Sequence, residues 1–124
     1  MVLKKMVVVF LVVFVICLLS IPTFAQSKKE LMEELSKARQ NFIAERDRLH
    51  DQNRVLRINW HNERAQLYQQ LEQNPKDKQI QEKLNEGAKK FLSDKDEIYK
   101  KLENLRKDWL KTRKELGEKI KTAS

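Results

Sequence analysis

The chain has 124 residues, of which 35% are charged, and it contains only two glycines, two prolines and one cysteine. A sheet protein needs a turn at about every ten residues, and so few Gly and Pro residues cannot supply those turns. The composition therefore excludes an all-β or βαβ fold and predicts an all-α protein. The net charge of +8 favours anionic partners without identifying one.

Residues 1–25 have the pattern of a secretory signal peptide. Two lysines precede an apolar run over residues 6–19, and a small-residue cleavage site ends at Ala25. The alternative is an uncleaved anchor through residues 6–21, although this run is shorter than the ~20 apolar residues that span a bilayer comfortably. Both alternatives predict an extracytoplasmic chain, because the lysines stay on the inner side of the membrane. It would be periplasmic or secreted if cleaved, and held in the inner membrane if not.

The lone cysteine, Cys17, lies within this apolar run. Lipidation of the bacterial lipoprotein type needs a small residue immediately before the cysteine, and Ile16 is not small. Cleavage of the signal would leave a mature chain without cysteine. Disulfides, thiol catalysis and cysteine-based zinc sites are then excluded together.

Residues 27–73 predict one long amphipathic helix. The segment has no Gly or Pro, and strong helix formers dominate it. Its apolar residues recur at helical spacing and form one narrow stripe. The stripe consists of Leu31, Leu35, Ala38, Phe42, Leu49, Leu56, Trp60, Leu67 and Leu71.

Residues 74–75 predict a tight turn, and residues 75–121 predict a second helix. Asn74 is a good N-cap, and Pro75 suits the first helical position, where its missing N–H is not needed. The second stripe consists of Ile80, Leu84, Phe91, Ile98, Leu102, Leu105, Trp109, Leu116 and Ile120. So short a connection implies antiparallel neighbours, so residues 26–124 should form a coiled-coil-like αα-hairpin.

Folding about this turn pairs residues whose numbers add to about 147. The pairs are Leu31 with Leu116, Ala38 with Trp109, Phe42 with Leu105, Leu49 with Ile98, Leu56 with Phe91, and Leu67 with Ile80. Trp60 faces Gly87, so each large indole meets a small residue, as close packing requires. A glycine inside a helix lowers helix stability by about 1 kcal/mol relative to alanine. The pairing explains why Gly87 is nevertheless present, because a residue without a side chain leaves room for Trp60.

The second helix carries a further apolar edge, formed by Ala88, Leu92, Tyr99 and Leu110. Two helices cannot enclose a core by themselves, and exposed apolar rows often mark an interface. We therefore predict an interface at Leu92, Tyr99 and Leu110, used for self-association into a dimer or small bundle or for docking of a client protein. The alternative is that these are scattered surface residues.

A mainly basic strip follows helical spacing along one flank of the first helix. It consists of Arg46, His50, Asn53, Arg57, His61, Arg64 and Tyr68, with the arginines and histidines as candidate anion-binding residues. Binding of an anionic chain would strengthen as the imidazoles protonate near pH 6. The alternative is a solvated flank that pairs with acids of the second helix. The basic cluster over residues 106–121 likewise favours an anionic polymer or membrane surface, or else only complements the helix dipole.

The sequence contains no recognisable catalytic or metal motif. It lacks a Gly-rich phosphate loop, HExxH, an EF-hand loop, GxSxG and any DNA-binding signature. His50 and His61 are the only histidines, and at about 16 Å apart along one helix they cannot share a metal. We predict no enzyme activity, no cofactor and no metal site. Nucleic acid is not expected as a partner of an exported chain, and membrane contact is expected only if residues 6–21 stay uncleaved.

The run RAQLYQQLEQNPKD at residues 64–77, followed by Ile80 and Leu84, resembles the central hairpin of the Spy, CpxP and ZraP group of small periplasmic proteins. The resemblance implies an exported, almost entirely helical protein that associates through long antiparallel hairpins. It also implies a role as an ATP-independent chaperone or as an envelope-stress or metal-responsive factor. The Leu-Thr-x-x-Gln signature of the group is absent, so no site residue carries over.

These observations predict a structural or interaction protein of the cell envelope with chaperone-like activity. The alternative function is a binding module for an anionic envelope polymer or membrane surface, which would bind through the basic helix faces.

Overall fold

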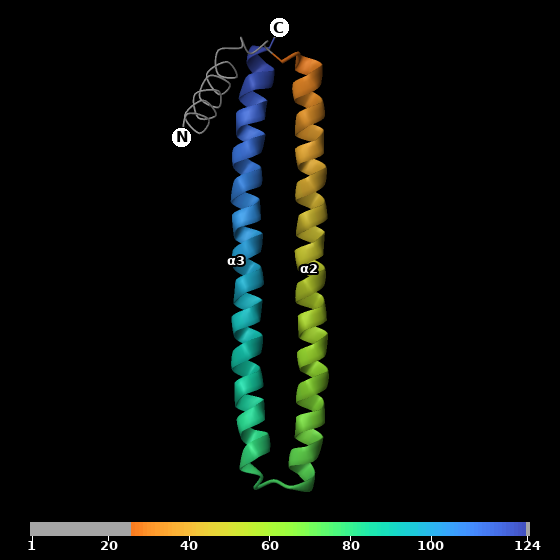
Figure 1. The fold of residues 1–124 in the computed structure, drawn as a ribbon, viewed down its shortest axis with the longest axis vertical. Coiled ribbons are helices and arrows are strands. Elements are labelled where there is room, and N and C mark those ends of the chain that lie inside the picture. The colour runs from red at the N-terminus through yellow and green to blue at the C-terminus, as the bar shows by residue number, and fades with distance from the viewer. Residues whose placement is uncertain (1–25, 124) are drawn as a thin grey trace, which may run out of the picture.

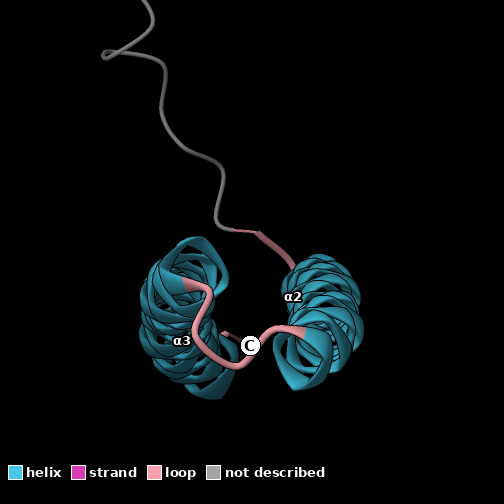
Figure 2. Ribbon diagram, turned by 90° about the horizontal axis from the view of Figure 1, so that it is seen from below, coloured by secondary structure: helices cyan, strands magenta, loops and turns pink. Residues whose placement is uncertain are grey.

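The computed structural model describes residues 26–123, which form two long α-helices and the turn between them (Figure 1). Helix α2 spans Lys28–Gln73 and helix α3 spans Lys78–Thr122. The helices run antiparallel, side by side along their whole length. Figure 2, seen along the helices, shows that no third element within residues 26–123 covers their sides. The predicted all-α architecture of two packed helices is confirmed, whereas the predicted signal peptide and Cys17 lie outside the described residues.

Helix α2 begins at a side-chain cap. The Oγ of Ser27 accepts a hydrogen bond from the backbone N–H of Glu30 at 3.2 Å, which satisfies one of the free donors of the first turn. The helix then continues for 46 residues without Gly or Pro. Neither helix within residues 26–123 offers a stretch that is both long and apolar enough to cross a membrane.

The second helix begins later than the sequence predicts, and its cap is a different residue. Asn74 does not cap α3 but ends α2, since its backbone N–H donates to the carbonyl of Gln70 at 3.1 Å. The N–H of Asp77 donates to the carbonyl of Asn74, also at 3.1 Å, and closes a turn through Pro75. Because the Asn74 backbone is used in this reversal, it cannot also start α3, and the predicted helix start at Pro75 is wrong.

Asp77 is the N-cap of α3. Its Oδ1 accepts hydrogen bonds from the backbone N–H groups of Gln79 at 3.0 Å and Ile80 at 3.4 Å. Aspartate caps a helix as well as asparagine does, and its charge also complements the positive end of the helix dipole. The turn therefore covers residues 74–77 rather than 74–75.

The core is a single seam between the two helices. Its buried apolar side chains all belong to the two predicted stripes: Leu31, Leu49, Leu67, Ile80 and Leu116. Leu49, near the middle of α2, is only 2% exposed. Because each helix is covered on one side only, the other stripe residues remain half-buried.

Trp60 packs against Gly87, as the sequence predicts. A Cβ added to Gly87 would lie 2.9 Å from Cη2 of the Trp60 ring and closer still to Cζ3. The constant-sum pairing is thus confirmed at the position where an error in register would cause the most severe clash.

Two aromatic stacks also join the helices. The rings of Phe42 and Trp109 lie 5.4 Å apart at 13°, and those of Trp60 and Phe91 lie 6.1 Å apart at 20°. Each ring meets a residue one helical turn beyond its predicted partner. The reason is that side chains lean toward the N-terminus of their own helix, so in an antiparallel pair two long side chains lean toward each other.

Candidate functional site

The predicted basic strip lies on α2, but a buried residue divides it. Asn53 is only 8% exposed, whereas the arginines and histidines of the strip are exposed. Arg46, on the N-terminal side of Asn53, forms an ion pair with Asp47 at 3.2 Å and lies over the Phe42 ring at 5.8 Å from its centre. The part of the strip beyond Asn53 has no such acidic partner among residues 26–123.

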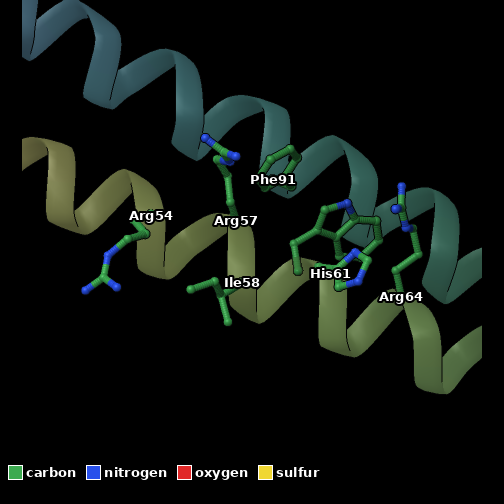
Figure 3. Close-up of a pocket in the computed structure, with 7 residues that line it drawn as sticks. Arg54, Arg57, Ile58, His61, Arg64 and Phe91 are labelled. Carbon is green, nitrogen blue, oxygen red and sulfur yellow. The ribbon is translucent and has the colours of Figure 1, made fainter.

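Arg57, His61 and Arg64 come together around a hollow of ≈ 660 Å³ in the surface (Figure 3). We call this the Trp60 hollow, and its lining consists of Arg54, Arg57, Ile58, Trp60, His61, Arg64 and Phe91. Figure 3 shows the side chains of Arg57 and Arg64 extending toward α3, with His61 between them. The hollow thus combines cationic groups with an aromatic and aliphatic surface.

The charges around the Trp60 hollow are only partly compensated. Arg54 points away from Phe91 in Figure 3 and pairs with Asp51 at 2.7 Å. Arg57, His61 and Arg64 form no ion pair with any residue of the described chain, where every ion pair joins two residues of the same helix. This flank is solvated, as the alternative to an anion-binding strip predicts, but within residues 26–123 it forms no ion pair with acids of the second helix.

A second hollow of ≈ 490 Å³ lies nearer the open end of the hairpin, outside the predicted basic strip except for Arg46. We call it the Trp109 hollow, and its lining consists of Leu35, Arg39, Phe42, Ile43, Arg46, Trp109 and Arg113. Like the first, it places arginines beside a tryptophan stacked on a phenylalanine from the other helix. Arg39 and Arg113 have no acidic partner within residues 26–123.

A repeat in the sequence relates the two hollows. Both helices contain the pattern Phe-x13-Leu-Arg-x2-Trp-x3-Arg-x2-Leu, and Trp60 and Trp109 are 49 positions apart. The pattern comprises Phe42, Leu56, Arg57, Trp60, Arg64 and Leu67 in α2, and Phe91, Leu105, Arg106, Trp109, Arg113 and Leu116 in α3. Antiparallel packing of two such repeats places each phenylalanine on the tryptophan of the other. This repeat is the sequence signal that predicts the second hollow. The repeat becomes visible when the two helices are aligned in the same direction, and not when residues that face each other across the turn are paired.

The predicted interface residues border the same face as the hollows. Leu92, Tyr99 and Leu110 are 61%, 49% and 42% exposed, and their spacing places them on one side of α3. At the 49-position offset, Leu92 corresponds to Ile43 and Leu110 to His61, which line the Trp109 and Trp60 hollows. The apolar edge and the basic strip therefore flank one surface of the hairpin.

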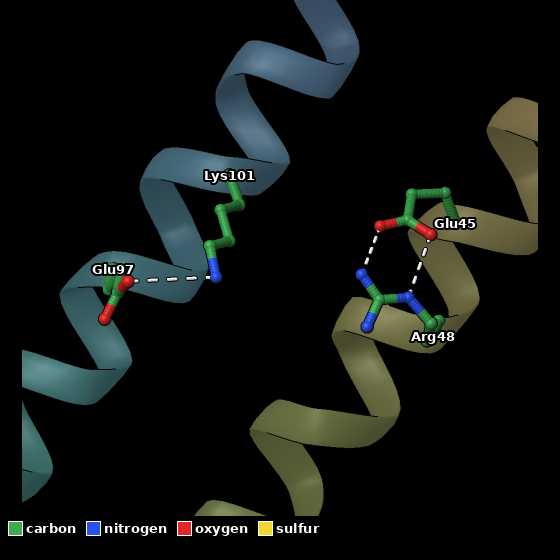
Figure 4. A network of polar contacts seen from close by, with 4 residues as sticks. All are labelled: Glu45, Arg48, Glu97 and Lys101. Carbon is green, nitrogen blue, oxygen red and sulfur yellow. Dashed lines mark hydrogen bonds and ion pairs between the residues drawn. The ribbon is translucent and has the colours of Figure 1, made fainter.

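Helical spacing places Glu45, Arg48, Glu97 and Lys101 on the opposite face, and Figure 4 shows the ion pair that each helix forms there. There Arg48 donates to both carboxylate oxygens of Glu45, with Nε 2.8 Å from Oε2, and Lys101 pairs with Glu97 at 3.7 Å. The hydrogen bond from Arg48 lowers the pKa of the exposed Glu45 carboxyl, and the charge of Lys101 acts in the same direction. The same bond raises the pKa of Arg48. Acids and bases therefore alternate on this face, unlike the face that holds the two hollows.

Comparisons with known proteins do not assign a family. No family model matches the chain, and no curated protein or solved structure matches it either. The resemblance to the Spy, CpxP and ZraP group thus stays a prediction. Among residues 26–123, no three His, Cys, Asp or Glu side chains are grouped so that they could hold a metal ion.

Proposed function

We propose that the protein is an exported interaction protein of the cell envelope with chaperone-like activity, and not an enzyme. The observation that carries this proposal is that the apolar residues between the two helices are not fully covered. The residues of the two aromatic stacks are only half-buried along one face, and no third element within residues 26–123 covers them. They are Trp60, Phe91, Phe42 and Trp109. A partner that covers this face would bury apolar surface that the hairpin itself leaves in contact with water.

The predicted apolar edge extends the binding surface. Leu92, Tyr99 and Leu110 lie beside the hollows and are largely exposed. Uncompensated arginines on the same face, such as Arg64 and Arg113, favour an acidic client over a second copy of this basic surface. Self-association through the edge must overcome the repulsion of like charges, so we propose client binding as its main role.

Aggregation of a client provides the test. α-Lactalbumin, an acidic protein, aggregates when its disulfides are reduced. The purified hairpin protein should slow this aggregation when it is present at a near-equal molar amount. The double variant Leu92→Asp/Leu110→Asp should lose most of this effect. Met32→Asp is the matched control, because Met32 is 54% exposed on α2 and lies outside the edge and both hollows. A protein that neither slows aggregation nor self-associates at micromolar concentration would contradict the proposal.

A second candidate function is the binding of an anionic polymer of the envelope. The specific observation is that Arg57, His61 and Arg64 converge without an acidic partner in the described chain. Such binding should weaken steeply as salt is raised, because exposed charges are screened beyond about 10 Å at 0.1 M ionic strength. Polyglutamate, which has no large apolar groups, is the probe, and salt-insensitive binding or none would exclude this function.

A further inference from the structure

We infer that the hairpin holds two related ligand sites, the Trp60 and Trp109 hollows, each of which binds one compact amphiphilic anion. The anionic head, a phosphate or carboxylate, lies beside Arg64 in one site and Arg113 in the other. The alkyl or aryl body lies on the adjoining tryptophan and phenylalanine rings. The inference rests on the second candidate function and narrows its ligand from an extended polymer to a small molecule.

The repeat gives each site a tryptophan, a phenylalanine and an arginine at corresponding positions, whereas the other lining residues of the two sites differ. Phe42 and Trp60 are 18 positions apart on α2, as are Phe91 and Trp109 on α3. Eighteen residues make five helical turns, so the two stacks lie on the same side of each helix, about 27 Å apart. Two antiparallel repeats are related by a twofold axis perpendicular to both helices, and this axis leaves both hollows on one face of the hairpin.

The charge on that face points to an anion. The row of α2 beside the seam consists of Arg39, Ile43, Arg46, His50, Arg57, His61, Arg64 and Tyr68. The corresponding row of α3 consists of Ala88, Leu92, Lys95, Tyr99, Arg106, Leu110, Arg113 and Gly117. Neither row contains an acidic residue, and the only acid paired with either row in the described chain is Asp47, at Arg46. The face thus offers cations together with apolar side chains.

The size and the lining of the sites point to a compact ligand rather than a polymer. The hollows measure ≈ 660 Å³ and ≈ 490 Å³, which is the size range of small-molecule pockets. Each is lined by two stacked aromatic rings as well as by guanidinium groups. A purely charged polymer would use the guanidinium groups but leave the rings uncovered, whereas an amphiphilic anion uses both.

The two tryptophans allow each site to be observed separately, because the chain contains no others. In Trp109→Phe the remaining indole reports on the Trp60 hollow, and in Trp60→Phe it reports on the Trp109 hollow. Decyl phosphate, kept below its micelle-forming concentration, should change the fluorescence of both variants saturably. Titration calorimetry of the wild-type protein should give two ligands per chain.

Charge variants test the role of the arginines. Arg64→Gln should weaken binding at the Trp60 hollow about tenfold, as expected for loss of one charge-assisted hydrogen bond, and Arg113→Gln should do the same at the Trp109 hollow. The matched control is Arg48→Gln, which removes the same charge from the opposite face and should leave both affinities unchanged. Calorimetry of the arginine variants, which keep both tryptophans, provides the same comparison if a tryptophan variant does not fold.

The remaining outcomes separate this inference from the functions proposed above. Equal weakening by Arg48→Gln, equally tight binding of uncharged decanol, or a fluorescence change with anionic vesicles but not with monomeric decyl phosphate would each overturn the two-site inference. Binding of polyglutamate without binding of decyl phosphate would overturn it and leave the anionic-polymer function standing. Failure of both probes would overturn both.

Discussion

The ring of Trp60 occupies the space that a side chain at position 87 would need. Gly87 lies inside α3, nearer its start than its middle, and a Cβ there would be 2.9 Å from Cη2 of the indole. No residue within the described chain has a positive φ that would call for glycine, so the reason for Gly87 is room and not backbone conformation. The close approach of the two helices at this level depends on this one missing side chain.

Gly87→Ala should destabilise the hairpin, although alanine is the better helix former. The gain in helix propensity is about 1 kcal/mol, but overpacking against the indole costs about 1–3 kcal/mol. Gly117→Ala is the matched control, because within the described residues nothing lies within 4 Å of its added Cβ, and it should be stabilising. Urea denaturation at one fixed protein concentration measures the free energy of unfolding of both variants. Equal stabilisation by the two substitutions would contradict the packing of Trp60 on Gly87.

Removal of the indole should reverse the effect of Gly87→Ala on the free energy of unfolding, from a decrease to an increase. Trp60→Ala alone should lower the free energy of unfolding by about 3 kcal/mol, near the lower limit for large-to-small aromatic changes, because Trp60 is only half-buried. In that background Gly87→Ala meets no ring and should stabilise the protein by about 1 kcal/mol. The double-mutant cycle on the four proteins measures this coupling. Additive effects would mean that the two residues do not interact in solution.

Asn53→Leu should raise the stability of the hairpin and make its helix register and oligomeric state less uniquely defined. Asn53 is buried in the seam, and its Oδ1 has no hydrogen-bond partner in the described part of the chain. An unsatisfied buried acceptor costs about 1–3 kcal/mol, so leucine should raise the urea midpoint. A lone asparagine in a helical seam also fixes register and oligomeric state. We therefore expect the variant, but not the wild type, to show additional oligomers by sedimentation; a lower midpoint would show that the side chain is satisfied.

Self-association, if it uses the face with the hollows, should increase with salt. That face carries basic residues and no acids in the rows beside the seam, so two copies repel each other at low ionic strength. Sedimentation at 0.05 M and 0.5 M salt tests this, with client binding measured in parallel. Client binding through the arginines should change in the opposite direction. Dimers that weaken as salt rises would place the interface on the mixed-charge face around Glu45 and Lys101 instead.

Periodicity and pairing predict much of this fold. The two stripes supply all five buried apolar residues of the described part of the chain, and a constant residue sum places Trp60 on Gly87. The start of α3 could not be predicted in the same way. Asn74 and Asp77 are equally good caps by residue type, and the backbone bonds that reverse the chain decide between them.

The candidate site depends on details that residue type does not show. Asn53 follows the spacing of the basic strip, but it lies close enough to the seam to be buried, which divides the strip. The stack of Phe42 on Trp109 requires side chains that lean along their helices, which facing pairs alone do not predict. The Trp109 hollow becomes predictable only when α2 is compared with α3 at the 49-position offset.

The shared pattern of α2 and α3 also bears on how such a molecule could arise. A single helix of this kind, paired antiparallel with an identical copy, would place phenylalanine on tryptophan twice and form both aromatic stacks without any connecting segment. The hairpin has the form of such a symmetric dimer whose two halves have been fused into one polypeptide at Asn74–Asp77. A single chain, unlike a dimer of identical helices, can carry different residues at corresponding positions, such as His61 in one half and Leu110 in the other.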